Sequence, residues 1–283
     1  MFKESYNKNI KLIEDYIKEF FDTRFENLEE KMVEPIKYSV LNGGKRIRGI
    51  LSVEIAKMLG GDINNALPFA MAIEFIHAYS LVHDDLPCMD DDDFRRGMPS
   101  CHKKFGEAMG VLCGDSLLNL SYEVMLESVI NGVKGADKAA REVANFAGIF
   151  GMIRGQVIDI NLVNSKNATL KDVELLIDNK TCALIKAAAL SGAYVSPHSD
   201  MDIKNISEYA YHLGMAFQIR DDFEDEEEDK EGEGTPNFIN LLGKDEAHKK
   251  LVYHKYEAEK ILNKYKNNAF LLGLNEFLFG SFK

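Results

Sequence analysis

The sequence is poor in proline and cysteine, and both scarcities limit the structures that it can form. Only 6 of its 283 residues are proline, and none lies between Pro99 and Pro197, a spacing that permits long helices and is unusual in a chain of many short strands. We find no alternating strand pattern of useful length. Without a CxxC pair, reduced thiols are expected in place of a disulfide or zinc site, and the thiols are Cys88, Cys101, Cys113 and Cys182.

Long apolar runs are also missing. The N-terminal segment MFKESYNKNIKLIEDY carries acids where a signal peptide has an apolar run. No apolar stretch of the chain approaches the roughly 20 residues that are needed to span a bilayer. We therefore expect a cytoplasmic protein that does not span a membrane.

Basic residues are outnumbered, since 34 Lys and Arg stand against 46 Asp and Glu and give a formal net charge of −12. Nucleic-acid phosphates are bound by clustered Lys and Arg, so this balance argues against nucleic acid as a partner. The excess acid lies in two segments. Residues 84–93 hold 6 acids and no base, residues 221–233 hold 10 acids and one base, and the remainder of the chain is slightly basic.

Apolar residues recur at three- and four-residue steps, which indicates amphipathic helices. The first such stripe covers residues 2–28, and further helices are predicted over 45–59, 66–86, 107–130, 139–161, 170–191, 203–223, 246–265 and 268–279. Thr169 and Asp172 have the spacing of a capping box at a helix start. With no linker and no internal repeat, the pattern predicts an all-α fold, a single-domain bundle of about ten helices over residues 1–283.

Two aspartate clusters each follow an apolar helix. Pro87 should end the first helix, so that Asp90 turns back towards Asp84. Asp221 and Asp225 share one face of the second helix, which is unfavourable unless a cation lies between them. Carboxylates without His or Cys at ligand spacing suit a hard cation such as Mg²⁺, and two solvated acidic loops are the alternative. The candidate carboxylates are Asp84, Asp85, Asp90, Asp221, Asp222 and Asp225.

Basic residues lie beside these carboxylates in the sequence. The segment GGKRIR, residues 43–48, opens a predicted helix, and Arg95 and Arg96 follow the first aspartates directly. Each group taken singly is also the pattern of a solvated surface pair. Together with the carboxylates they predict a diphosphate that is held by metal on one side and by Arg or Lys on the other.

These motifs, in this order, resemble the trans-polyprenyl diphosphate synthases, and most closely the bacterial farnesyl diphosphate synthases. The matching segments are GGKRIR at 43–48, IHAYSLVHDDLPCMDDDDFRRGMPSCHKKFGEA at 76–108, GQVID at 155–159, KT at 180–181 and FQIRDD at 217–222. The resemblance implies an isoprenoid-synthase bundle around a central active-site cavity. It also implies a homodimeric, Mg²⁺-dependent prenyltransferase that joins isopentenyl diphosphate to an allylic diphosphate such as dimethylallyl or geranyl diphosphate, giving farnesyl diphosphate.

The resemblance also implies roles for single residues. Those that would bind Mg²⁺ are Asp84, Asp85, Asp90, Asp221, Asp222 and Asp225. Those that would hold isopentenyl diphosphate are Lys45, Arg48, His77 and Arg96. Those that would face the allylic substrate as catalytic residues are Arg95, Lys180, Thr181 and Gln218, and a pocket-lining pair is Gln156 and Asp159. Metal ions and basic side chains would lower the barrier to ionisation by stabilising charge on the leaving diphosphate.

Product length is predicted from Tyr79, which lies five residues before Asp84 on the same predicted helix. Five residues are more than one helical turn, so the Tyr79 ring can close the floor of a pocket that receives the growing chain. In the family, an aromatic residue there accompanies a fifteen-carbon product, and an ordinary core tyrosine is the alternative. Other open readings are a geranylgeranyl synthase, a terpene cyclase, against which Lys45, Arg48 and His77 speak, and a non-catalytic partner subunit.

The resemblance weakens after Asp225. The segment EEEDKEGEGTPNFINLLG, residues 226–243, is shorter than the usual family loop, and Glu233 stands near where a phosphate-binding Lys is expected. Lys230 or Lys244 is a candidate replacement. We expect weaker allylic diphosphate binding, a higher Mg²⁺ requirement, or both, in comparison with a relative that has both family lysines.

Overall fold

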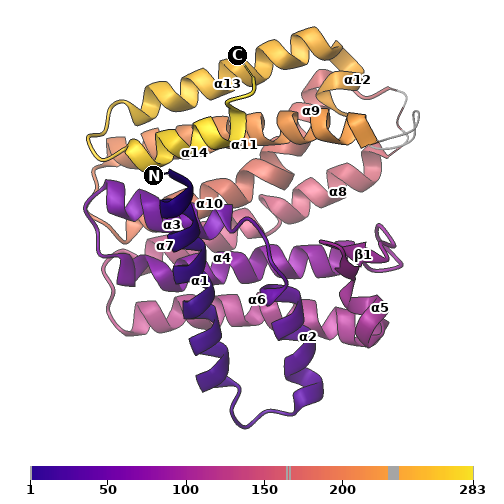
Figure 1. Ribbon diagram of the computed structural model, residues 1–283, viewed down its shortest axis with the longest axis vertical. Coiled ribbons are helices and arrows are strands. Elements are labelled where there is room, and N and C mark those ends of the chain that lie inside the picture. Colours follow the sequence, from indigo (N-terminus) through magenta and orange to yellow (C-terminus); the bar gives the residue numbers. More distant parts are fainter. Residues whose placement is uncertain (1, 164, 166, 229–235, 283) are drawn as a thin grey trace.

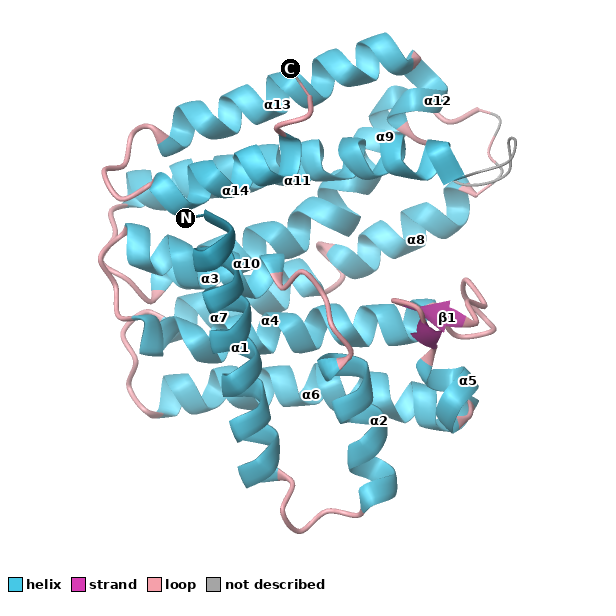
Figure 2. Ribbon diagram, viewed as in Figure 1, coloured by secondary structure: helices cyan, strands magenta, loops and turns pink. Residues whose placement is uncertain are grey.

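The computed structural model describes residues 2–163, 165, 167–228 and 236–282, and this part of the chain is almost entirely helical (Figures 1 and 2). Its one sheet is a two-stranded antiparallel hairpin, β1 (Phe94–Arg95) and β2 (Met98–Pro99), in which Phe94 pairs with Pro99. The expected all-α isoprenoid-synthase fold is confirmed. Glu233 and Lys230, which the sequence singles out, lie outside the described residues.

The helices follow one another along the chain with short connections. The first half of the chain contains α1 (Phe2–Arg24), α2 (Glu30–Leu41), α3 (Ile47–Met58), α4 (Ile63–Asp84), α5 (Cys101–Phe105), α6 (Glu107–Ile130) and α7 (Ala136–Ala147). The second half contains α8 (Met152–Leu162), α9 (Leu170–Ile177), the π-helical turn η1 (Asp178–Cys182), α10 (Ala183–Tyr194), α11 (Asp200–Glu228), α12 (Phe238–Leu242), α13 (Lys244–Leu262) and α14 (Ala269–Phe279).

The central helices α3, α4 and α10 are buried on nearly all sides. In Figure 1, α4 runs between α10 and α6, and it packs against α3, α6 and α10. This helix has 22 residues and a mean hydropathy of 1.2 in its most apolar 18-residue window, so by length and composition it is long enough to cross a membrane. The expectation that no apolar run reaches this length is therefore wrong for α4. Because 72% of that window is buried inside the bundle, α4 fits the role of a core helix.

The predicted helix over residues 139–161 is wrong as one element, because α7 ends at Ala147 and α8 begins at Met152. The chain turns at Gly148–Gly151, where a Cβ atom on Gly151 would lie 2.0 Å from the carbonyl oxygen of Phe146. Only glycine allows this close approach. The spacing of apolar residues did not predict α2, α5 and α12.

Other local predictions agree with the structure. The capping box at the start of α9 is present, with Thr169 Oγ1 accepting from the Asp172 amide at 3.3 Å and the Thr169 amide donating to Asp172 Oδ2 at 2.9 Å. All four cysteines are free thiols; Cys88 is exposed and the others are buried. The segment GGKRIR leads directly into α3, as predicted.

Candidate active site

A cavity of about 400 Å³ opens between α4, α8 and η1. Its polar lining contains seven of the residues predicted from the sequence, Arg48, His77, Tyr79, Asp84, Gln156, Lys180 and Thr181. The rest of the wall is mainly apolar and includes Leu81, Met89, Met152, Ile153, Val157, Ile160 and Leu184. A cavity with a charged rim and an apolar wall suits a ligand that has an anionic head and a hydrocarbon tail.

The first aspartate cluster forms the end of α4. The helix stops at Asp84, and the amide of Asp90 donates to the carbonyl oxygen of Asp84 at 2.9 Å, so the chain turns back as predicted. Burial raises the pKa of Asp84 to about 6, Lys180 opposes the shift, and the negative charge of Asp90 adds to it. Burial raises the pKa of Asp90 as well. Both carboxylates are therefore held where their ionised forms are penalised until a cation binds.

Asp85 is engaged differently from its neighbour Asp84. Its side chain is 3% exposed and accepts from Arg95 Nε at 2.9 Å and from Arg95 Nη2. The same guanidinium donates to Asp92 at 2.9 Å. Asp85 and Arg95 line a separate cavity of about 30 Å³ together with Arg96. The structure thus places Asp85 as the partner that holds Arg95, beside the large cavity.

The second aspartate cluster lies near the end of α11. Burial raises the pKa of Asp221, and its ion pair with Arg220 opposes that shift. Asp222 is 5% exposed and accepts from Gln218 Nε2 at 3.2 Å and from the Phe238 amide at 3.3 Å, which connects α11 to the first residue of α12. The side chain of Asp225 lies outside the described residues.

The described carboxylates match a Mg²⁺ site only when a bound substrate supplies further oxygen ligands. In the described ranges, no three His, Cys, Asp or Glu side chains are grouped closely enough to hold a metal ion. Mg²⁺ in proteins typically keeps several waters and takes one or two carboxylates plus substrate phosphate oxygens. The hard oxygens of Asp84, Asp90 and Asp221, each with a pKa raised by burial, match that donor set.

The π-helical turn η1 brings Lys180 and Thr181 to the cavity wall. Thr181 Oγ1 donates to Gln218 Oε1 at 2.7 Å, and Lys180 forms an ion pair with Asp159 on α8. This packing needs Gly155, since a Cβ atom there would lie 2.3 Å from the backbone nitrogen of Lys180. Single π turns inside helices occur frequently at functional sites because they redirect side chains.

The third group lies at the start of α3. Arg48 Nη1 and His77 Nε2 lie 3.4 Å apart, and Arg96 Nη1 donates to the carbonyl oxygen of Gly43 at 2.5 Å. Burial lowers the pKa of His77 well below its usual value, and the positive charges of Arg48 and Arg96 lower it further. The imidazole is therefore neutral. With Lys45 exposed beside them, these cations and the N-terminus of α3 form an anion-binding arrangement.

Sequence reasoning missed several residues of this site. Arg220 is 5% exposed, pairs with Asp221 and Glu224, and lies over the Phe217 ring with its Cζ atom 4.4 Å from the centroid. Its position beside two acids was a signal, because a basic residue within an acidic cluster usually neutralises it. The apolar cavity wall on α8 was hidden by the incorrect continuous helix over 139–161.

Comparisons with known proteins agree with this geometry. The sequence profile of the family described as polyprenyl synthetase matches residues 29–264. Farnesyl diphosphate synthase of Bacillus subtilis (strain 168) is 36% identical over 83% of this chain and 83% of its own length. The large subunit 1 of the chloroplastic heterodimeric geranylgeranyl pyrophosphate synthase of Arabidopsis thaliana is 37% identical over 87% of this chain, which spans 65% of that protein.

A solved structure extends the likeness to the whole fold. The geranyltransferase of Helicobacter pylori, crystallised with magnesium and isoprenyl diphosphate, superimposes with a TM-score of 0.83 and 28% identity, covering 98% of this chain and 97% of that one. The matched region contains the motifs that line the cavity, from the start of α3 to the end of α11. The chain belongs to the polyprenyl synthetase family.

Proposed function

We propose that this protein condenses isopentenyl diphosphate with dimethylallyl or geranyl diphosphate and releases farnesyl diphosphate and diphosphate. The observation that carries the proposal is one cavity whose lining combines Asp84 of the first aspartate cluster, the basic side chains of Arg48 and Lys180, and an apolar wall. The likeness to a farnesyl diphosphate synthase over 83% of the chain supports the same reaction. The chemistry needs two diphosphate sites of different character and a dry space for hydrocarbon between them.

The allylic diphosphate would bind at the two aspartate clusters. Mg²⁺ held there by Asp84, Asp90 and Asp221 would supply positive charge to the leaving diphosphate oxygens. Asp85, Asp222 and Asp225 complete the two clusters, and Asp85 holds Arg95 in place through its ion pair. Arg95 and Lys180 would add positive charge on the diphosphate itself, which lowers the barrier to breaking the allylic C–O bond.

The developing carbocation would be stabilised from the cavity wall. Thr181 donates its hydroxyl proton to Gln218, so the lone pairs of Thr181 Oγ1 remain available to face positive charge. Apolar side chains on α8 exclude water that would otherwise capture the cation. Gln156 and the ion pair of Asp159 with Lys180 complete the polar side of this wall.

Isopentenyl diphosphate would bind at the start of α3, where Lys45, Arg48 and Arg96 provide positive charge and His77 a neutral imidazole. Its double bond would attack the allylic cation, forming the new C–C bond and leaving a cation that loses a proton. The released diphosphate can take the final proton, so no enzyme base is required. A geranylgeranyl product is the second candidate, because the chain also resembles a geranylgeranyl pyrophosphate synthase subunit and Ile153, Val157 and Ile160 remain 42 to 56% exposed along the cavity.

We also propose that the chain acts as one domain over residues 1–283, as a cytoplasmic homodimer. Exposed apolar side chains on α6 and in the turn before α8 support an interface, namely Val111, Leu112, Leu126, Ile130, Ile149 and Phe150. Large apolar side chains that are exposed to solvent mark protein contacts where they form a contiguous patch. Light scattering coupled to size exclusion would give twice the mass of 31.9 kDa if the dimer forms.

The test incubates the purified protein with Mg²⁺, isopentenyl diphosphate and either allylic primer, and sizes the products by mass spectrometry. Asp84→Ala should abolish product, whereas Asp15→Ala, an exposed acid on α1 that pairs with Lys11, should leave it unchanged. A fifteen-carbon product that depends on Asp84 supports the farnesyl reaction. A twenty-carbon product supports the second candidate, and no product at high Mg²⁺ contradicts both.

A further inference from the structure

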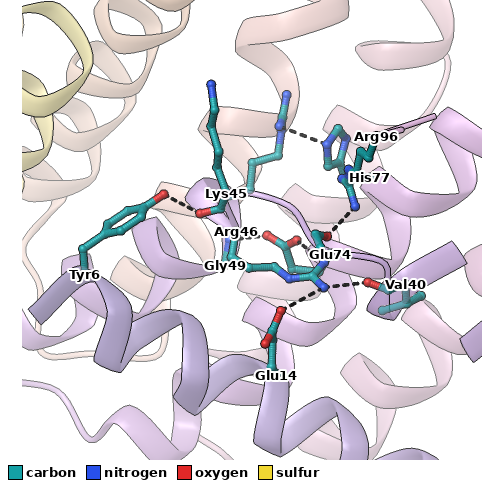
Figure 3. A network of polar contacts seen from close by, with 11 residues as sticks. Tyr6, Glu14, Val40, Lys45, Arg46, Gly49, Glu74, His77 and Arg96 are labelled. Carbon is teal, nitrogen blue, oxygen red and sulfur yellow. Dashed lines mark hydrogen bonds and ion pairs between the residues drawn. The ribbon is translucent and has the colours of Figure 1, made fainter. Parts of the chain in front are cut away.

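A buried polar network lies beneath the cationic loop at the start of α3 (Figure 3). Its centre is Arg46, whose side chain is 2% exposed and whose Nη2 donates to the carbonyl oxygen of Val40 at 2.6 Å. The same guanidinium pairs with Glu74 on α4 at 3.5 Å and with Glu14 on α1 at 3.4 Å. One side chain thus connects the loop to α1, α2 and α4.

The backbone at Arg46 is held in an unusual conformation. Its φ is +49° and its ψ is +25°, the left-handed region that costs a residue with a Cβ atom about 1 kcal/mol or more. The other described non-glycine residues with positive φ are Asp91 and Arg96. Such a conformation persists only where surrounding contacts determine it, and the buried guanidinium supplies those contacts.

Glu74 completes the start of α3. Arg46 occupies the N-cap position but makes no side-chain capping bond, and Glu74 Oε1 instead accepts from the Gly49 amide at 2.8 Å. A free helix N–H donor is therefore satisfied by a carboxylate from another helix, next to the positive end of the α3 dipole. Glu74 is 3% exposed, so this bond and the Arg46 ion pair are shielded from water.

Neighbouring residues at the start of α3 have different surroundings. In Figure 3, the Lys45 side chain points away from the Arg46 guanidinium, and the Lys45 carbonyl accepts from the Tyr6 hydroxyl at 2.5 Å. Burial lowers the pKa of Arg48, and the negative charge of Glu74 opposes that shift. The pKa of Asp84, on the allylic side, responds instead to burial, Lys180 and Asp90.

We propose that Arg46 is a positioning residue, which binds no substrate and fixes Lys45 and Arg48 where they receive the diphosphate of the isopentenyl substrate. This inference rests on the proposed function, because it assigns Arg46 to one of the two diphosphate sites. Its main effect falls on that site, since Arg46, Glu74, Glu14 and Tyr6 bond to one another or to the backbone around the start of α3; the charge of Lys45 reaches only Asp221 of the proposed metal ligands described above.

The decisive variant is Arg46→Lys, which keeps the charge but loses the planar fork, so that one ammonium cannot reach Val40 and both carboxylates together. We expect the KM for isopentenyl diphosphate to rise about tenfold, a change of about 1.4 kcal/mol. The KM for the allylic substrate and kcat at saturation should stay within about twofold of wild type. Tyr6→Phe removes only the bond to the Lys45 carbonyl and should raise the same KM by about threefold.

The matched control is Glu54→Asp. Glu54 is also a buried charged residue of α3, and it bonds Asn9 at 2.7 Å and Lys57 at 2.6 Å. It should lower thermal stability without changing either KM. Should Arg46→Lys fail to fold, as judged by circular dichroism, Glu14→Gln replaces it, because this variant neutralises one partner of the Arg46 guanidinium; an unchanged KM for isopentenyl diphosphate in Glu14→Gln would then overturn the proposal.

Calorimetric titration with isopentenyl diphosphate separates this inference from the proposed function. Wild-type binding that is about tenfold tighter than that of Arg46→Lys supports the positioning role, even if the protein forms no product and the proposed function fails. Equal affinities, an equal rise in both KM values, or a wild-type protein that binds no isopentenyl diphosphate would each overturn it.

Discussion

Acid should weaken the packing of α13 on α11 through a pair of buried histidines. His212 of α11 and His254 of α13 are 7% and 6% exposed, and their Nδ1 atoms lie 2.8 Å apart. At this distance one nitrogen donates a proton and the other accepts it, so the accepting ring must be neutral. A proton added to that ring would place two N–H groups against each other and break the bond.

The magnitude follows from the shifted pKa of His254. Burial is the largest cause, and together with the positive charges of His212 and Lys250 it lowers this pKa from 6.5 to about 3. Burial also lowers the pKa of His212. The negative charges of Glu208 and Glu257 oppose this shift, and the positive charge of Lys260 adds to it. Because the folded-state pKa lies below the unfolded value, stability is full above pH 6.5 and is lost as the pH falls towards 3. For His254 alone, linkage predicts a loss of about 2 kcal/mol between pH 7 and pH 5.

The assay compares urea unfolding of wild type and His254→Gln at pH 7 and pH 5. The glutamine keeps a donor and an acceptor but does not titrate in this range, so the variant should lose about 2 kcal/mol less than wild type between the two pH values. Carboxylates with raised pKa, such as Asp84, act in the opposite direction and cancel in this difference. Equal losses for wild type and His254→Gln would refute the reasoning.

Three further predictions concern catalysis. Tyr79 is 6% exposed, lines the cavity and packs edge-on against His83. Tyr79→Ala should therefore give products longer than fifteen carbons. An unchanged product mass would contradict the prediction that Tyr79 closes the floor of the pocket. Gly155→Ala should reduce kcat at least tenfold, because the new Cβ atom displaces Lys180, while the helical circular dichroism spectrum is retained. A kcat equal to that of wild type would mean that η1 can shift without affecting catalysis. The Mg²⁺ concentration that gives half-maximal activity should be higher for this protein than for a relative with both loop lysines. Equal Mg²⁺ concentrations for the two proteins would contradict the expected effect of the segment after Asp225.

Much of the fold could be predicted from spacing because most helices bury one face. The predicted helix over 107–130 has the observed bounds of α6, and Thr169 marks the start of α9 through its capping chemistry. The break between α7 and α8 could not be found this way, since apolar residues continue through it at helical steps. Gly151 is required there by a tertiary contact with its own preceding helix, and periodicity carries no information about such contacts.

The sequence predicted which residues belong to the candidate site, but not the different contacts that adjacent residues make there. Asp84 and Asp85 are neighbours with the same side chain, yet one lines the large cavity and the other is occupied by Arg95. Arg46 and Arg48 stand two residues apart in one basic motif and face different surroundings. These differences arise from the left-handed turn before α3 and from the end of α4, which only the folded backbone reveals.

The bond from the Phe238 amide to Asp222 has a consequence for how the family can vary. It connects the first residue of α12 to the body of α11, after the sequence stretch in which the resemblance to the family is expected to weaken. Because the entropy of closing a connection rises only slowly with its length, residues can be lost or gained between these two anchor points at little thermodynamic expense. Divergence in this stretch can therefore alter how the enzyme handles its substrate while the surrounding helices keep their packing.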